Sequence, residues 1–233
     1  MKLMVPLSIS QIEAANRLHQ RLPQWQITDH ALHALQVCFP DFGSEATLLK
    51  VVAVNQLYGT NVYAVIRMAQ HVVDVMLDLK NIEDVELVEE LATLTGRKHL
   101  SFASKFAHFF IDMERFPIYD SFAVKMVAYH LGRQGKVTNT AHPYKAFVEN
   151  INRLKERAHL SCTSKEIDRY LWLAGLYQEW RTAAKPEINR EIEELFESLF
   201  INSLPISPLS EMLPTEFAHL ERKKPRAKKD KKE

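Results

Sequence analysis

Residues 100–125 read LSFASKFAHFFIDMERFPIYDSFAVK, and this stretch carries the clearest structural signals in the chain. On a helical wheel that advances about 100° per residue, the apolar side chains between positions 102 and 110 gather on one side. The polar side chains fall together on another side, within about 60° of one another. They are Ser101, Lys105, His108 and Asp112. The pattern predicts an amphipathic helix over residues 102–112 that buries its phenylalanines.

The residues that follow predict a short connector and a second helix. Pro117 holds Phe116 out of the helical region of backbone space. Asp120 is one of the preferred N-cap residues, and an apolar pattern follows it as far as Leu131 and Gly132. We therefore expect two helices joined by a short loop, with Lys105 on the first and Asp120 at the start of the second.

The rest of the chain shows helical periodicity, and no segment alternates long enough to predict a strand. The predicted fold class is all-α, with about nine or ten helices. We expect one helical domain over residues 1–203, followed by an extended segment and a basic tail over 204–233. The other predicted helices cover 10–19, 28–38, 44–57, a segment opening at Thr60 or Asn61, 81–95, 143–158, and segments opening at Thr163 and Pro186. Ser10 with Glu13 and Thr163 with Glu166 predict capping boxes, and Gly59 predicts a left-handed C-cap.

Composition excludes several classes of protein. The chain has 233 residues, of which 46% are hydrophobic and 25% charged, so it is neither disordered nor a membrane-spanning protein. Six glycines are few for an all-β fold with many tight turns. Two widely separated cysteines, Cys38 and Cys162, are typical of free thiols, and the predicted location is cytoplasmic.

Charge is distributed unevenly along the chain. Residues 221–233, ERKKPRAKKDKKE, hold eight of the 30 lysines and arginines, including Lys223 and Lys224. Residues 1–220 then carry a net charge of about −4, which is a poor general footprint for nucleic acid. The tail supplies phosphate contacts or serves only as a solvated end, and composition alone leaves both open.

Motifs for common cofactors and metals are missing. The chain has no glycine-rich phosphate loop, no HExxH and no CxxC, and its ten histidines are scattered. We therefore expect no cofactor and no bound metal.

The 100–125 stretch resembles the helix-hairpin-helix DNA glycosylase superfamily, most closely its 8-oxoguanine branch. Residues 101–105 (SFASK) match the family's G-x-G-x-K hairpin, with Ser101 and Ala103 in place of the glycines, and 117–120 (PIYD) match its P-V-D connector. Residues 48–60 resemble the first core helix of the family, and residues 166–180 resemble its closing aromatic helix. The resemblance covers residues 44–183.

This resemblance implies a DNA base-excision glycosylase and abasic lyase acting on an extruded damaged nucleotide of double-stranded DNA. Lys105 would be the Schiff-base nucleophile, and Asp120 would stabilise the oxocarbenium charge. The residues implied to contact DNA are Asn55, Gln56, Ser101 and Ser104, to which the tail adds Lys223 and Lys224. The residues implied to form the base pocket are Trp172, Tyr177 and Trp180.

Ordinary structural roles explain the same residues. Asp120 is a good helix cap, Lys105 fits the solvated side of an amphipathic helix, and tryptophans and tyrosines are often core residues. The alternative hypothesis is a non-catalytic module that keeps the helical fold and binds nucleic acid or protein. The missing hairpin glycines and the acidic body favour that alternative.

Overall fold

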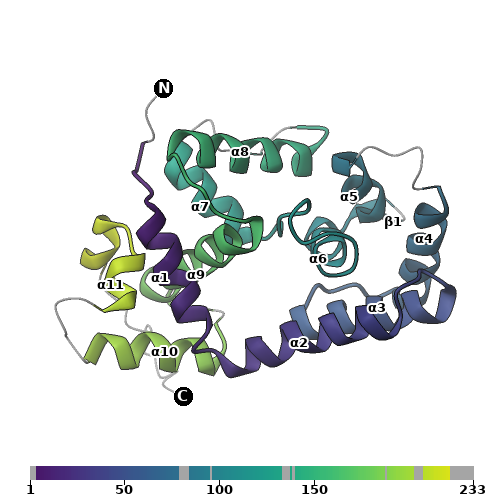
Figure 1. Cartoon of the computed structure of the whole chain (residues 1–233), viewed down its shortest axis with the longest axis horizontal. Helices are drawn as coiled ribbons and strands as arrows, with labels where there is room; N and C mark the ends of the chain where they lie inside the picture. The colour runs from purple at the N-terminus through teal and green to yellow at the C-terminus, as the bar shows by residue number, and fades with distance from the viewer. Residues whose placement is uncertain are drawn as a thin grey trace, which may run out of the picture.

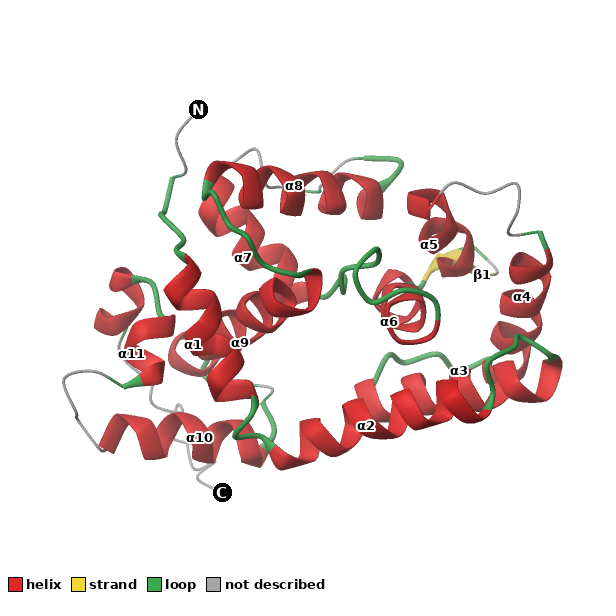
Figure 2. Cartoon of the chain, in the orientation of Figure 1, coloured by secondary structure: helices red, strands yellow, loops and turns green. Residues whose placement is uncertain are grey.

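The fold is described from a computed structural model of the chain. It describes residues 4–78, 84–94, 96–132, 137, 140–186, 188–201 and 207–220. The predicted all-α class is confirmed, because helices dominate the described residues and the only strands among them form one short pair (Figure 2).

The described part of the chain contains eleven α-helices, one 3-10 helix and two short strands. In chain order they are α1 (Ile9–His19), α2 (Pro23–Cys38), α3 (Ser44–Tyr58), α4 (Val65–Leu77), α5 (Asp84–Ala92), β1 (Thr93–Leu94), β2 (Arg97–Lys98), α6 (Leu100–Phe110), α7 (Ser121–Leu131), α8 (Pro143–Arg157), α9 (Ser164–Thr182), α10 (Arg190–Ile201), α11 (Pro208–Met212) and η3 (Thr215–His219).

The helices form two groups that meet along the middle of the molecule (Figure 1). One group contains α2 to α6, in which α3 packs against α2, α4 and α6. The other contains α1 and α7 to α11, in which α9 packs against α1 and α7. The long helix α2 runs along one edge from the first group to the α1–α10 side, and α5 contacts α8 across the top (Figure 1). A contiguous hydrophobic core runs through both groups.

Three helix boundaries agree with local sequence signals. Asp120 is the N-cap of α7, and its side chain accepts a hydrogen bond from the Ala123 backbone. Gly59 ends α3 in the left-handed conformation, at φ 56° and ψ 44°. Thr163 and Glu166 form the capping box that opens α9. These signals act within one turn of helix, so tertiary packing does not override them.

Other boundaries differ from the predicted ones, each for a local reason. The capping box of α1 is formed by Ser8 and Gln11 rather than by the predicted Ser10 and Glu13. Helix α2 begins at Pro23 instead of position 28, because proline is well tolerated at the first helical position. Helix α4 begins at Val65, since Asn61 has a positive φ of 58° and interrupts the backbone before it.

The C-terminal part also differs from the prediction. Helix α10 begins at Arg190 rather than at Pro186. Ser207 caps α11 within the segment expected to be extended, and α11 packs against α1. Leu209, Met212 and Phe217 are buried, so the folded body reaches past the predicted boundary at 203. The basic tail over 221–233 lies outside the described residues.

Residues 101–105 do not form a hairpin, which corrects the match made from the sequence. They lie inside α6, and the antiparallel pair β1–β2 precedes that helix. Gly96 lies between the two strands with φ at 75°, a conformation that glycine adopts without a side-chain clash. The strand pair β1–β2 thus lies between α5 and α6, a few residues before the sequence match.

No described helix has both the length and the apolar character needed to cross a membrane.

Helices α7 and α9 pack closely at Gly175. A Cβ atom at this position would lie 2.7 Å from Cβ of Phe122 and 3.1 Å from its backbone Cα. We predict that Gly175→Ala lowers the free energy of unfolding by about 1–3 kcal/mol, measured by urea denaturation. Helix propensity alone would raise it by about 1 kcal/mol, so an unchanged or increased stability would contradict the close packing.

Candidate active site

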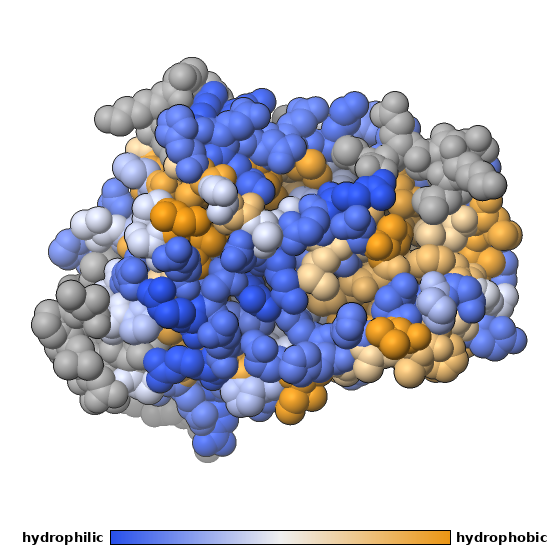
Figure 3. All heavy atoms as spheres, in the orientation of Figure 1, coloured by the Kyte–Doolittle hydropathy of each residue, from blue (hydrophilic) through white to orange (hydrophobic). Residues whose placement is uncertain are grey.

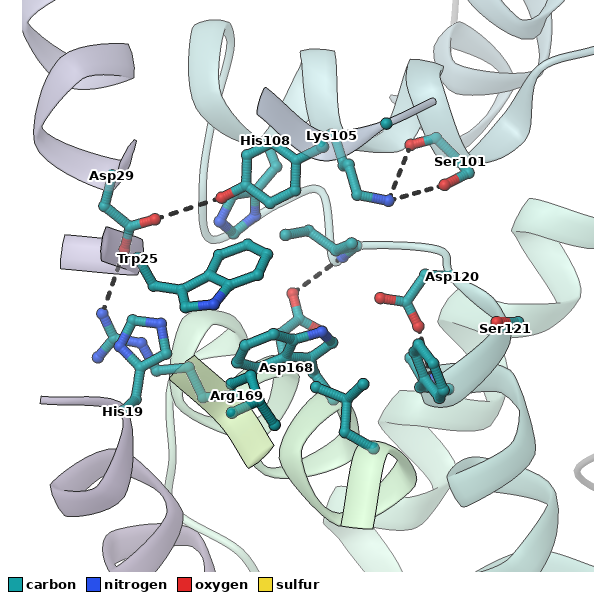
Figure 4. Close-up of a pocket in the computed structure, with 18 of the residues that line it drawn as sticks. His19, Trp25, Asp29, Ser101, Lys105, His108, Asp120, Ser121, Asp168 and Arg169 are labelled. Atoms are coloured by element: carbon teal, nitrogen blue, oxygen red, sulfur yellow. Dashed lines mark hydrogen bonds and ion pairs between the residues drawn. The ribbon is translucent and has the colours of Figure 1, made fainter. Parts of the chain in front are cut away.

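A cavity of about 650 Å³ lies where the two groups of helices meet. Its lining comes from distant parts of the chain, including α1, α2, α3, α6, α7, α9 and α10. Figure 4 shows Lys105 entering from α6, Asp120 from the start of α7 and Asp168 from α9. This volume falls within the range of about 300–1,000 Å³ typical of small-molecule sites.

Lys105 is buried in the wall of this cavity, with only 6% of its surface exposed. Its Nζ donates to Oγ of Ser101 at 2.7 Å and to the Ser101 carbonyl at 3.3 Å. Burial lowers the pKa of Lys105 below its usual 10.5, although the nearby carboxylates of Asp120 and Asp168 oppose the shift. The site therefore favours the neutral amine more than water does.

Aromatic rings form one wall of the cavity. Trp25 contacts Trp172 edge-on at a centroid distance of 4.6 Å and Tyr58 at 5.6 Å. Tyr58 contacts Phe109 at 5.3 Å, and Nζ of Lys105 lies 5.8 Å from the Tyr58 ring. A wall of this kind is suited to stacking with a flat, unsaturated ligand.

A polar network closes the same wall. Asp29 accepts a hydrogen bond from the Tyr58 hydroxyl at 3.3 Å and pairs with Arg169 at 3.5 Å. Lys165 lies 3.9 Å from the same carboxylate. The Asp29 carboxylate thus interacts with Tyr58, Arg169 and Lys165 rather than with Lys105.

The connector between α6 and α7 is held by side chains from three helices. His108 of α6 donates from Nδ1 to the Phe116 carbonyl at 2.9 Å, and Ser104 of α6 accepts from the Tyr119 backbone at 2.9 Å. The Tyr144 hydroxyl of α8 donates to the Pro117 carbonyl at 3.1 Å. Oδ2 of Asp168 of α9 accepts from the Ile118 backbone at 2.9 Å. These four contacts fix the connector that places Asp120 opposite Lys105.

Asp120 lies at the N-terminus of α7 and lines the cavity. Its Oδ1 accepts from the Ala123 backbone at 2.7 Å, which holds the carboxylate against the first turn of the helix. The partial positive charge at that helix end stabilises a negative side chain there. Asp120 is thus a positioned anion that is only partly exposed.

Two histidines line the cavity in their neutral form. Burial is the main cause that lowers the pKa of His108 to about 4, and Lys165, Arg169 and Lys105 add to it. Burial also lowers the pKa of His19 to about 3, with Arg169 as the next cause. Because the Phe116 carbonyl accepts from His108 Nδ1, the proton of neutral His108 lies on that nitrogen.

Several residues predicted from the sequence meet in this cavity, and others do not. Lys105, Asp120, Ser101 and Trp172 all line it. Ser104 is fully buried and bound to the connector, so the structure gives it a structural contact and no exposed surface for a phosphate.

Tyr177 and Trp180 lie elsewhere. Both are 2% exposed and pack against Phe196 of α10, with centroid distances of 5.3 and 5.5 Å. Neither lines the cavity, because they lie on the face of α9 that packs against α10. Of the three residues predicted to form the base pocket, Trp172 is the one that lines the cavity.

Asn55 is engaged in the loop after α3. Its Oδ1 accepts from the Val62 backbone at 2.9 Å and from the Thr60 hydroxyl at 2.9 Å, while Nδ2 donates to the Val62 carbonyl at 3.0 Å. Gln56 is exposed and does not line the cavity. Lys223 and Lys224 lie outside the described residues.

Most residues of the cavity wall belong to no sequence motif. Asp168 carries the one signal that the sequence offers, since it is an acid between the apolar residues Ile167 and Leu171 of α9. Trp25, Asp29 and Tyr58 reach the cavity only through the packing of α2 and α3 against α6. Within the described ranges, no group of three or more histidines, cysteines and acids is placed to hold a metal ion.

Comparison with known proteins gives two partial similarities. Residues 11–115 match a protein family described as HI_0787_N, an N-terminal domain. An uncharacterized protein of Haemophilus influenzae is 32% identical over 137 residues, which is 52% of this chain and 62% of that protein. The chain therefore spans less than two thirds of the length of this relative. The family match includes Lys105 but ends before Asp120 and Asp168. No solved structure matches the chain.

The neutral state of His108 predicts loss of stability in acid. Between its usual pKa of 6.5 and its folded value of about 4, only the unfolded chain binds the proton, so stability falls as pH falls. His19 and His130 act in the same direction, whereas Asp168, whose pKa is raised, acts in the opposite one. The free energy of unfolding should fall with pH less steeply in His108→Gln than in wild type. We predict that near pH 5 the change per pH unit is smaller by about 1.4 kcal/mol.

The measurement is urea denaturation at a series of pH values. His30→Gln is the matched control, because His30 is exposed and lies outside the cavity. An unchanged slope in His108→Gln would mean that folded and unfolded chains protonate His108 equally.

Proposed function

We propose that the protein is a DNA glycosylase and abasic lyase that forms a Schiff base between Lys105 and C1′ of an extruded nucleotide. The observation that carries this proposal is a desolvated lysine inside an aromatic cavity, beside a carboxylate fixed at a helix N-terminus. A lysine becomes a nucleophile only as a free amine, and burial of Lys105 favours that form.

The cavity supplies the other groups that the reaction needs. The Lys105 amine forms a bond to C1′ while the bond from C1′ to the base breaks, and the base leaves with that electron pair and takes up the proton that the amine loses. The nitrogen lone pair then forms the C=N bond while the C1′–O4′ bond breaks, so the sugar ring opens and O4′ takes up a proton as a hydroxyl. Positive charge develops on the sugar in this step, and the Asp120 carboxylate is fixed where it can stabilise that charge. Trp25 and Trp172 offer ring surfaces for the extruded base.

Two features of the chain support DNA as the substrate. Residues 100–125 resemble the helix-hairpin-helix glycosylases in sequence, and the largely exposed strand pair β1–β2 lies directly before the helix that carries Lys105. Arg97 is exposed at that hairpin, next to Gly96. Lys98 is also exposed, although its Nζ already donates to the Ala141 carbonyl.

A non-catalytic binding module is the second candidate, and a surface feature favours it. Three apolar side chains on or just before α4 are largely exposed: Tyr63 (85%), Ile66 (76%) and Leu77 (82%). Figure 3 shows apolar surface gathered over the α3–α4 end of the molecule, while polar residues dominate the α1–α9–α10 side. Exposed apolar side chains that gather in one area of the surface are typical of a protein-binding site.

Borohydride trapping on duplex DNA with an abasic site tests the lyase. We expect a covalent adduct with the wild-type chain that falls at least about 100-fold in Lys105→Gln. Lys145→Gln is the matched control, because Lys145 is exposed on α8 and does not line the cavity. That variant should form the adduct at close to the wild-type rate.

Other outcomes separate the alternatives. An adduct that persists in Lys105→Gln but disappears when residues 221–233 are removed would assign the reaction to tail lysines. Failure of the wild-type chain to form any adduct would contradict the lyase and favour the binding module.

Paired substitutions of Asp120 separate its capping role from its charge. Asparagine caps helices about as well as aspartate, so Asp120→Asn should keep the unfolding free energy within about 0.5 kcal/mol of wild type. Asp120→Ala should lower it by about 0.5–2 kcal/mol. Both should slow adduct formation at least about tenfold, because both remove the carboxylate. If Asp120→Asn kept the wild-type rate of adduct formation and only the less stable Asp120→Ala lost it, Asp120 would have a structural role alone.

A further inference from the structure

Asp168 is a buried acid that the motifs do not explain. It is 6% exposed on α9 and lines the same cavity as Lys105. Oδ2 accepts the hydrogen bond from the Ile118 backbone, while Oδ1 is buried without a hydrogen-bond partner in the described part of the chain. An unpaired buried carboxyl oxygen is costly, and a group bound in the cavity would supply the missing partner.

Geometry places Asp168 and Lys105 around the same space. Figure 4 shows the Asp168 and Lys105 side chains approaching the same region from α9 and α6. Oδ2 of Asp168 is bound to the Ile118 backbone. Lys105 and Asp168 line the same cavity, and among the described residues they form no ion pair with each other within 4.0 Å. A group bound in the cavity between them would therefore contact both side chains. The Asp120 carboxylate lies to one side, held by the first turn of α7.

The surroundings of Asp168 favour its protonated form. Burial raises its pKa well above 3.8, and the Ile118 N–H opposes that shift. Asp120 and Glu114 of the connecting segment raise it further, whereas Lys105 of α6 lowers it. Tyr144 of α8 is a further titratable neighbour: burial raises its pKa, and the charge of Asp168 raises it further.

We propose that Asp168 is the acid–base residue of the Schiff-base cycle, giving a proton to the hydroxyl that leaves C1′ and then taking one from C2′. This inference rests on the proposed lyase function. It assigns two separate tasks to the two acids, since Asp120 stays a fixed anion while Asp168 exchanges a proton.

The proton balance closes within the cavity. Lys105 adds to the open aldehyde of the abasic sugar and gives a carbinolamine. Protonated Asp168 then donates to the C1′ hydroxyl, the C–O bond breaks, water leaves and the iminium forms. The resulting Asp168 carboxylate removes a proton from C2′, and the electron pair of that C–H bond gives the enamine. The enamine expels the 3′ phosphate with the C3′–O electron pair, and Asp168 is protonated again.

Asp168→Asn tests this role with little change in shape. The amide oxygen keeps an acceptor for the Ile118 N–H, but the side chain no longer exchanges a proton. In single-turnover reactions on abasic duplex DNA, we expect both trapped adduct and strand scission to slow by about 100-fold. The pH dependence of scission, measured from about pH 5 to about pH 9, should lose an inflection that the wild type shows. Asp74→Asn on the exposed face of α4 is the matched control and should behave as wild type.

Asp168→Glu keeps the proposal testable if the asparagine variant does not fold. A carboxyl group on a longer side chain should restore part of the rate and move the inflection in the pH profile. A structural role alone would leave that inflection at its wild-type pH. The inference would be overturned if Asp168→Asn trapped the adduct and cut the strand at rates within about threefold of wild type. It would also be overturned if the inflection in the pH profile of Asp168→Glu stayed at its wild-type pH.

Failure of the inference is distinguishable from failure of the proposed function. A wild-type chain that forms a Lys105-dependent adduct, together with an unaffected Asp168→Asn, overturns the role of Asp168 alone. A wild-type chain that forms no adduct overturns the lyase, and the role of Asp168 with it.

Discussion

The segment between α6 and α7 must place its backbone polar groups inside the molecule without the help of a helix or a sheet. Residues 116–119 are buried or half-buried, and buried backbone groups need partners. His108, Ser104, Tyr144 and Asp168 supply those partners from α6, α8 and α9. The same contacts determine where the segment ends, and therefore where Asp120 opens α7 relative to Lys105. The geometry of the cavity thus depends on the hydrogen bonding of four residues of irregular backbone.

Sequence reasoning succeeded where the determining interaction spans one turn of helix. Asp120, Gly59 and the Thr163–Glu166 box are signals of this kind, and the structure confirms all three. The all-α class followed in the same way from helical periodicity. Asn55 shows the limit of that reasoning, because its amide organises the loop up to Val62 and so delays the start of α4. Side-chain bonds to a loop backbone leave no periodic trace.

The walls of the cavity could not be predicted for a different reason. Helix α9 buries residues on nearly every face, among them Asp168, Leu171, Tyr177 and Trp180. When a helix is buried on nearly every face, periodicity does not tell which face meets a cavity and which meets the core. Trp172 and Trp180 were therefore equivalent candidates in the sequence, and only the packing of α10 against Trp180 separates them. Asp168 meets Lys105 through contacts between helices that are far apart in the chain.

Burial of a lysine is not by itself a sign of catalysis, as Lys50 shows. Lys50 is fully buried, donates to the Asp41 carbonyl at 2.8 Å and lies 4.2 Å from the Phe42 ring. Burial lowers its pKa too, yet it does not line the cavity that holds Lys105. Lys105 differs because its amine faces open space shared with one fixed anion and one acid that has an unpaired oxygen. Lys105 is thus distinguished by the combination of groups around one cavity, of which its own desolvation is only one part.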